Sequence, residues 1–289
     1  MSNPVTPGLV VVDKPGGMTS HDVVARVRRL AGTRKVGHAG TLDPMATGVL
    51  VLGVDRATRL LGHLMLTEKQ YDATIRLGTS TTTDDAEGDV SAQADPAVLA
   101  VITEEMVRSE LAGFVGNIEQ VPTAVSAIKV DGKRAYARVR DGEQVELKAR
   151  PVTIHELTVH DVSLPEVRIS VRCSSGTYIR AIARDLGAAL GVGGHLGALR
   201  RSAVGSFDLD AARSLEDLAD DFAVLPIAAA ARATFTCLDL DQAHADDVRF
   251  GRALDLALDG ITAVFDPAGE FLALYEPRNG SARALAVFV

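Results

Sequence analysis

The chain has 289 residues, of which 47% are hydrophobic and 4% aromatic, and its net charge is −8. This length and composition predict one large domain, or one domain with a small appendage, around an aliphatic core. The two cysteines, Cys173 and Cys237, exclude a disulfide framework and an all-cysteine zinc site, and the seven histidines show no metal-ligand spacing. We expect no signal peptide, and no apolar run approaches the roughly 20 residues that span a bilayer. These features predict a cytoplasmic protein without membrane contact.

The negative net charge argues at first against a nucleic-acid partner, but the charges are segregated along the chain. Residues 206–260 carry 12 acidic and 4 basic residues, and residues 84–110 carry eight acidic residues and one basic residue. Three other stretches, 26–35, 129–150 and 168–201, are locally basic. Contacts with phosphates require such patches, although a solvated helix face is the alternative for each patch alone. Together they favour an RNA partner.

Apolar periodicity and capping residues predict the elements of the first half of the chain. Between residues 69 and 78, alternation places Tyr71, Ala73 and Ile75 on one side of a strand. Residues 79–95 are rich in Thr, Asp and Gly and predict an exposed acidic loop. We expect further strands at 9–12 and 49–54, and helices from a Thr19 or Ser20 cap to Ala31, from Arg56 to Met65, and from a Thr103 cap to Ala112.

The second half of the chain predicts further strands, followed by an acidic, Ala-rich linker and a small β-rich module. Extended segments broken at Pro122 precede a basic stretch, Lys133 to Arg140, that we expect to be helical. Residues 206–234 are acidic and Ala-rich, which predicts short helices and a linker. The remaining expected elements are strands at 152–162, 166–173 and 199–205, a helix at 177–190, and a small β-rich C-terminal module with a helix near 241–250 and strands at 261–265, 271–275 and 284–289.

The loop over residues 37–48 is the stretch around which the rest of the chain is organised. It contains three glycines, a proline, His38 and Asp43. Glycine and proline interrupt regular secondary structure, and here they are too dense for a helix or a strand. Apolar runs flank it, and loops held between core elements are where chemistry tends to lie. An Asp-Pro turn without chemistry is the alternative.

This loop reads GHAGTLDPMATG and resembles the catalytic loop of the bacterial tRNA pseudouridine-55 synthases, the TruB family. Four further stretches resemble motifs of that family in the family's order. They are the Lys-Pro motif at 13–20, the Lys-x-Tyr motif at 69–71, the start of the RNA-clamping insertion at 121–132 and the Gly-Thr-Tyr-Ile-Arg motif at 175–180. A chance match of the whole ordered set is very unlikely.

The resemblance implies an α/β (α+β) pseudouridine-synthase fold with a mixed, mainly antiparallel central sheet and helices around it. It implies a catalytic domain at residues 1–225, with an RNA-clamping insertion at about 128–150. A linker and a small C-terminal PUA-like domain would follow at residues 226–289. This last module is short and acidic, whereas phosphate binding favours basic residues, and a stability appendage is the alternative.

The implied chemistry explains the residue types. Pseudouridine formation breaks the C1′–N1 bond of a uridine, rotates the uracil and joins C1′ to C5, so we expect no cofactor and no metal. It needs a group that attacks, or stabilises charge at, ribose C1′ or uracil C6, and a carboxylate can do either. By resemblance this group is Asp43, which Arg180 keeps ionised. A covalent route at the base and a glycal route both remain open.

The resemblance assigns substrate contacts to other residues. Tyr71 would stack on the flipped uracil and serve in proton transfer at C5, with a core tyrosine as the alternative. His38 would pack into the opened RNA loop, with a capping histidine as the alternative. Tyr178 and Leu199 are expected to form the wall of the site.

The basic residues are expected either to contact the RNA or to hold the central loop in place. Arg200 and Arg201 are expected to meet phosphate, and Lys129 is expected to bind substrate at the start of the insertion. Lys14 either contacts the RNA or the site, or holds the loop in place.

The sequence thus predicts a stand-alone monomer that isomerises the T-loop uridine of tRNA, position 55, with the T-arm as partner and no obligate protein partner. A non-catalytic RNA-binding or RNA-folding module is one alternative, and the catalytic subunit of an RNA-guided synthase is another. A hydrolase using His38 and Asp43 has no nucleophile or metal pattern to support it.

Overall fold

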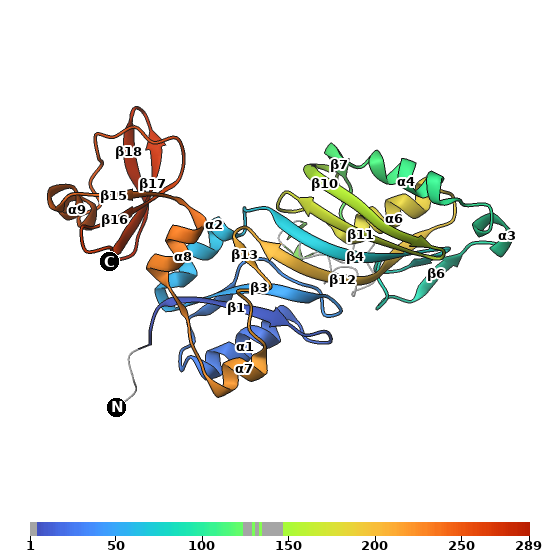
Figure 1. The fold of residues 1–289 in the computed structure, drawn as a ribbon, viewed down its shortest axis with the longest axis horizontal. Coiled ribbons are helices and arrows are strands. Elements are labelled where there is room, and N and C mark those ends of the chain that lie inside the picture. Colours follow the sequence, from blue (N-terminus) through green and yellow to red (C-terminus); the bar gives the residue numbers. More distant parts are fainter. Residues whose placement is uncertain (1–4, 124–128, 131–132, 135–146) are drawn as a thin grey trace.

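The computed structural model describes residues 5–123, 129–130, 133–134 and 147–289. A ten-stranded sheet forms the main body, and a separate four-stranded sheet lies at the C-terminal end (Figure 1). The central path of the large sheet runs through β14 (Leu225–Pro226), β1 (Gly8–Lys14), β3 (Thr47–Val54), β12 (Gly194–Val204), β4 (Lys69–Leu77), β11 (Glu166–Cys173), β10 (Arg150–Ser163) and β7 (Gly116–Gln120). Two short strands extend it, β2 (Val36–His38) beside β3 and β13 (Phe207–Asp208) beside β12.

The pairings of the large sheet are antiparallel except that between β12 and β3, which is parallel. The mixed, mainly antiparallel sheet that the family resemblance implies is therefore confirmed. The helices of the described residues are α1 (Ser20–Leu30), the 3-10 helix η1 (Asp55–Leu60), α2 (Leu61–Leu64), α3 (Pro96–Leu99), α4 (Glu104–Ala112), α6 (Ile179–Ala189), α7 (Leu215–Asp220), α8 (Ile227–Thr234) and α9 (Gln242–Arg249). Helices α4 and α6 pack on the β12–β4–β11–β10 half, and α1 and α7 pack together beside β1 (Figure 1).

Strands β1 and β3 are buried on both faces, which explains why their sequences are continuous apolar runs rather than alternating ones. Val10 and Leu50 face the core that α1 covers. Their neighbours Leu9 and Val51 face a second core that includes Phe265 of the C-terminal sheet. Strand β4, in contrast, alternates as predicted, with Ala73, Ile75 and Leu77 buried.

Local capping fixes the helix starts that the sequence predicts. Thr19 accepts a hydrogen bond from the amide of Asp22, and the Asp22 carboxylate accepts one from the amide of Thr19, which forms a complete capping box before α1. Thr103 caps α4 through the amide of Met106. Both predicted helices are confirmed.

Three predicted elements differ from the structure. The helix expected from Arg56 to Met65 is split into η1 and α2, and the spacing of the buried Ala57 and Leu60 matches the three-residue period of a 3-10 helix. Within the basic stretch expected to be helical, Lys133–Arg134 is instead strand β9, paired with β8 (Lys129–Val130), and residues 135–140 lie outside the described residues.

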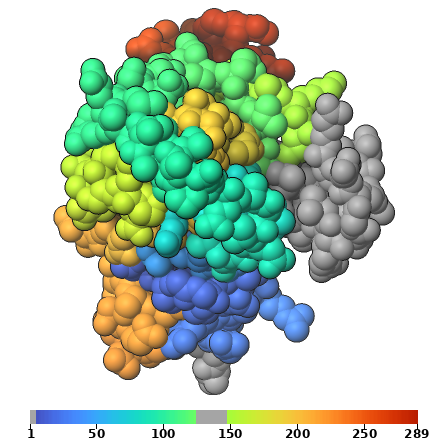
Figure 2. All heavy atoms as spheres, turned by 90° about the vertical axis from the view of Figure 1, so that its right-hand side faces the viewer, coloured from blue at the N-terminus to red at the C-terminus, as the bar shows by residue number. Residues whose placement is uncertain are grey.

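The expectation of an exposed loop at 79–95 is also wrong. Strands β5 (Thr79–Thr81) and β6 (Val90–Gln93) form a hairpin, and Asp85 in the connection between them is buried. Figure 2 shows the end of the molecule opposite the C-terminal sheet. There the teal-to-green residues of this hairpin and of α3 and α4 lie above the blue N-terminal segment.

The C-terminal module is β-rich, as predicted. Its strands lie in the order β15 (Thr236–Asp239), β16 (Thr262–Phe265), β17 (Phe271–Arg278) and β18 (Ser281–Val287), and β15 is a strand that the sequence analysis missed. Arg56 donates from Nη1 to the carbonyl of Phe288 at 2.8 Å, and Arg59 donates from Nη1 to that of Val287 at 2.7 Å. The two arginines of η1 therefore bind the end of the C-terminal sheet to the main body.

None of the helices in the described part of the chain is long and apolar enough to cross a bilayer.

Replacing both Arg56 and Arg59 by alanine is expected to lower the free energy of unfolding by about 1–3 kcal/mol, because two carbonyls lose charged donors. Urea titration followed by circular dichroism measures this change. Arg283→Ala, an exposed change on β18, is the matched control and should alter stability by less than about 0.5 kcal/mol. Superimposable curves for the double variant and the wild type would contradict the anchoring role.

Candidate active site

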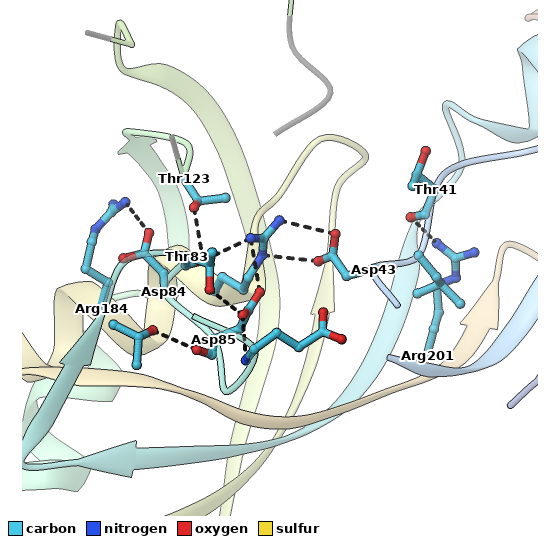
Figure 3. Close-up of polar contacts among 12 residues, drawn as sticks. Thr41, Asp43, Thr83, Asp84, Asp85, Thr123, Arg184 and Arg201 are labelled. Atoms are coloured by element: carbon cyan, nitrogen blue, oxygen red, sulfur yellow. Dashed lines mark hydrogen bonds and ion pairs between the residues drawn. The ribbon is translucent and has the colours of Figure 1, made fainter. Parts of the chain in front are cut away.

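Arg201 fixes the loop that lies between β2 and β3. Its side chain, only 2% exposed, donates from Nε to the carbonyl of Val49 at 2.8 Å. One terminal nitrogen lies 3.2 Å from the carbonyl of Gly40. The other lies 3.5 Å from the carbonyl of Thr41 (Figure 3). The expectation that Arg201 meets phosphate is wrong, because its guanidinium is buried against the backbone of the loop.

Lys14, at the end of β1, holds the same loop from the other side. Its ammonium donates to the carbonyls of Pro15 at 2.9 Å, Met18 at 2.6 Å and Pro44 at 3.1 Å. The residue is fully buried, and burial lowers the pKa of Lys14. Of the two alternatives for Lys14, the structure favours the loop support, since all three donors are engaged by the backbone.

Two small residues complete the fixation of the loop. The hydroxyl of Ser20, at the start of α1, accepts from the amide of Leu42 at 2.9 Å and donates to its carbonyl at 3.0 Å. Gly48 has a φ of +96°, and a Cβ at this position would lie 2.2 Å from the carbonyl oxygen of Arg201. Only glycine allows β3 and β12 to approach here.

The loop presents Asp43 to Arg180, which lies in the first turn of α6. Nε of Arg180 lies 3.1 Å from Oδ2 of Asp43, and Nη2 donates to Oδ1 at 3.2 Å. Such a two-point contact fixes the orientation of both groups. The Arg180 side chain is 6% exposed but that of Asp43 is 34% exposed, so the carboxylate remains within reach of a substrate.

Opposing influences act on the pKa of Asp43. Burial raises it, and the positive charge of Arg180 works against that rise. The negative charge of Asp85 raises the pKa further, whereas the charges of Lys14 and Arg201 lower it. The net direction is upward from the usual value of 3.8.

Asp85 is a site residue that the sequence analysis missed. Its Oδ2 lies 3.2 Å from Nη1 of Arg180, and the same nitrogen donates to the carbonyl of Thr83 at 2.9 Å (Figure 3). Oδ1 of Asp85 accepts from the amide of Glu87 at 3.1 Å and from the hydroxyl of Thr83. The sequence signals only a turn here, because the burial of Asp85 depends on a distant arginine.

Tyr71 and Lys69 lie on β4 and face the same side of the sheet. Tyr71 is half-buried and is the register partner of Arg201 on β12. Burial raises the pKa of Tyr71, while the charge of Arg201 and a hydrogen bond from it act in the opposite direction. Lys69 is buried and donates to the carbonyls of Met65 and Thr67, and burial lowers its pKa to about 8.

The other predicted site residues lie around this centre. His38 ends β2 and meets His21 edge-on, with ring centroids 5.7 Å apart. Tyr178 immediately precedes α6, and the guanidinium of Arg150 lies 5.4 Å from the centre of its ring. Lys129 belongs to β8, but its side chain lies outside what the structure describes.

Leu199 and Arg200 line a groove of about 510 Å³, together with Met45, Thr47 and seven other residues. Leu199 is buried, in keeping with a wall position. Arg200 makes a two-point contact with Asp13, at 3.0 Å from Nη1 to Oδ1 and 2.7 Å from Nη2 to Oδ2. Its guanidinium therefore already has an anionic partner.

The arrangement can act as a nucleophile or as an anionic stabiliser of positive charge. Asp43 supplies a fixed and reachable carboxylate, and Arg180 favours its ionised form. Among the described residues, no group of three or more His, Cys, Asp and Glu side chains is placed to hold a metal ion.

Models of known families match most of the chain. The N-terminal domain of the TruB family pseudouridylate synthases matches residues 28–179. The tRNA pseudouridylate synthase B C-terminal domain matches residues 180–231, and the C-terminal domain of tRNA pseudouridine synthase II matches residues 235–289.

Whole-length relatives carry one name. The tRNA pseudouridine synthase B of Streptomyces griseus is 56% identical to this chain, over 97% of both chains. The protein of the same name from Thermobifida fusca is also 56% identical, over 97% of this chain and 98% of its own. A solved structure described as a Cbf5-Nop10-Gar1 complex matches with a TM-score of 0.76 at 24% identity, over 99% of this chain and 86% of that chain, which shows a shared fold.

Lys14→Met is expected to lower the free energy of unfolding by about 1–3 kcal/mol, because three backbone carbonyls lose their donor while the apolar stem is kept. Urea titration of the two proteins measures the difference. Lys35→Met is the control, since that ammonium is 74% exposed and its ion pair with Asp55 should contribute less than about 1 kcal/mol. Equal losses in the two variants would show that Lys14 is no special support of the loop.

Proposed function

Because the chain belongs to the TruB family of pseudouridylate synthases, we propose that it isomerises a uridine of tRNA to pseudouridine, with Asp43 as the reacting carboxylate. The observation that carries this proposal is the forked pair of Arg180 and Asp43, in which the arginine is buried and the carboxylate is reachable. The name shared by the whole-length relatives supports tRNA as the substrate. The resemblance of the loop supports position 55 in the T-loop, and hence recognition of the T-arm.

The reaction must bring a base out of its stack, because Asp43 lies within a loop that is fixed on the protein. Extruding a nucleotide costs roughly a few kcal/mol, and stacking of the base on an aromatic ring can offset this cost. Tyr71 is the proposed stacking partner. Burial raises its pKa, so the phenol carries its proton at neutral pH and can take part in hydrogen bonding to the base.

The chemical step is balanced within the nucleotide and the protein. The C1′–N1 bond breaks and the C1′–C5 bond forms, while C5 loses a proton and N1 gains one. Both routes, addition of Asp43 to C6 and loss of the base with a glycal intermediate, begin from the ionised carboxylate. Arg180 favours that form and holds its orientation, and Asp85 and Thr83 hold Arg180.

The alternatives are weaker. A solely RNA-binding role does not account for a buried arginine that orients a reachable carboxylate. The second alternative is the catalytic subunit of an RNA-guided synthase. The likeness to the Cbf5-Nop10-Gar1 complex, at 24% identity, concerns the fold alone. The relatives at 56% identity are instead named tRNA pseudouridine synthase B. We therefore propose a stand-alone enzyme that works as a monomer.

Asp43→Asn is expected to abolish the modification while tRNA binding is retained. Tritium release from an unmodified tRNA transcript labelled at uracil C5 measures the rate, which should fall by at least about 10⁴-fold. Asp161→Asn, which changes a partly exposed carboxylate on β10, should keep the wild-type rate. Continued pseudouridine formation by the Asp43→Asn protein would refute the assignment.

Arg180→Gln is expected to move the acid limb of the pH–rate profile to higher pH. The positive charge of Arg180 lowers the pKa of Asp43, so its removal raises that pKa, and the ionised fraction falls at a higher pH. Single-turnover rates measured across the acid range test this shift.

Arg108→Gln is the control for this shift, because Arg108 lies on α4 with its side chain 43% exposed and pairs with Glu104. Its acid limb should coincide with that of the wild type. A limb that stays in place in the Arg180 variant would contradict the electrostatic role.

A further inference from the structure

The start of α6 is held by a residue from the far edge of the sheet. Tyr178, the N-cap of the helix, makes no capping bond through its own side chain. Instead, Gln120 at the end of β7 donates from Nε2 to the carbonyl of Tyr178 at 3.1 Å and accepts from its amide through Oε1 at 2.8 Å. Gln120 is only 2% exposed, so water does not replace these contacts.

The residues after Gln120 contact the same helix and the same partners of Arg180. The carbonyl of Val121 accepts from Nη2 of Arg184 at 2.7 Å. The hydroxyl of Thr123 lies 3.3 Å from the carbonyl of Thr83, which also accepts from Arg180 (Figure 3). The segment from Gln120 to Thr123 thus contacts both the backbone at the start of α6 and the carbonyl that binds the guanidinium of Arg180.

We propose that Gln120 is a positioning residue for the reaction: by binding both backbone groups of Tyr178, it fixes the start of α6 so that Arg180 meets Asp43 in the forked geometry. This inference rests on the proposed function. Asp85 and Thr83 fix the guanidinium end of Arg180, and Gln120 fixes the backbone end two residues before it.

The chemistry of the side chain explains why an amide is used. A primary amide offers a donor and an acceptor on one rigid plane, which match the carbonyl and the amide of one residue. Asparagine has the same groups but a shorter reach, and methionine has neither a strong donor nor a strong acceptor. A small rotation of α6 would break one contact of the fork, because each of its two distances is already above 3 Å.

Gln120→Met tests the proposal in the full chain, with Asn117→Ala as the matched control. Asn117 lies on the same strand, and its amide oxygen accepts from the hydroxyl of Thr153 at 2.8 Å, away from α6. The single-turnover rate of tritium release should fall by about 10- to 100-fold in Gln120→Met, since displacement of a catalytic group by about 1 Å costs rates of that order. The Kd for tRNA should stay at the wild-type value, and the control should react at the wild-type rate.

The pH–rate profile separates positioning from a general loss of stability. A displaced Arg180 lowers the pKa of Asp43 less, so the acid limb of Gln120→Met should move to higher pH, in the direction expected for Arg180→Gln. The other charged groups that act on Asp43, which are Asp85, Lys14 and Arg201, are unchanged in both Gln120 variants.

Gln120→Asn keeps a polar group in the buried position and is measured in the same way, so misfolding of the methionine variant does not decide the outcome. A wild-type rate, or a reduced rate with an unmoved acid limb, in a folded Gln120 variant would overturn the inference. An inactive wild-type protein would instead overturn the proposed function.

Discussion

Arg180 is a buried cation with two carboxylate partners, and the candidate active site depends on this arrangement. Taking a guanidinium out of water costs free energy unless it is paired and hydrogen-bonded. Its partners come from separate segments, Asp43 from the loop before β3 and Asp85 from the β5–β6 connection. Since Asp85 and Thr83 bind the guanidinium independently of Asp43, the Asp43 carboxylate can change its bonding while the arginine stays in place.

The frame that holds Asp43 is as constrained as its partner. Strands β1 and β3 pair with each other and are covered on both faces, so the loop between β2 and β3 ends in a strand that two cores hold in place. Lys14 and Arg201 reach that loop from β1 and β12, and both donate their hydrogen bonds to backbone carbonyls. Two buried cations beneath the loop also lower the pKa of Asp43, so the same groups serve geometry and electrostatics.

Periodicity and capping predicted those helices and strands that depend on residues close together in the sequence. The alternation of β4, a cap at Thr19 or Ser20 and the Thr103 cap were predicted in this way, and the loop around Asp43 was recognised as the centre of the chain. The mixed central sheet was instead expected from the family resemblance. Asp85, Gln120 and the buried role of Arg201 were missed, because a charged or amide side chain is buried only where tertiary partners satisfy it. Those partners lie far away in sequence, and no local pattern specifies them.

Lys69, buried at the start of β4, makes folding a proton-releasing event in alkaline solution. Its pKa falls from 10.5 in the unfolded chain to about 8 in the folded one, so between these values the unfolded chain holds the extra proton. Stability from this group therefore rises with pH across that window. A calorimeter would record, along with the heat of unfolding, the ionisation heat of whichever buffer supplies the proton that Lys69 takes up.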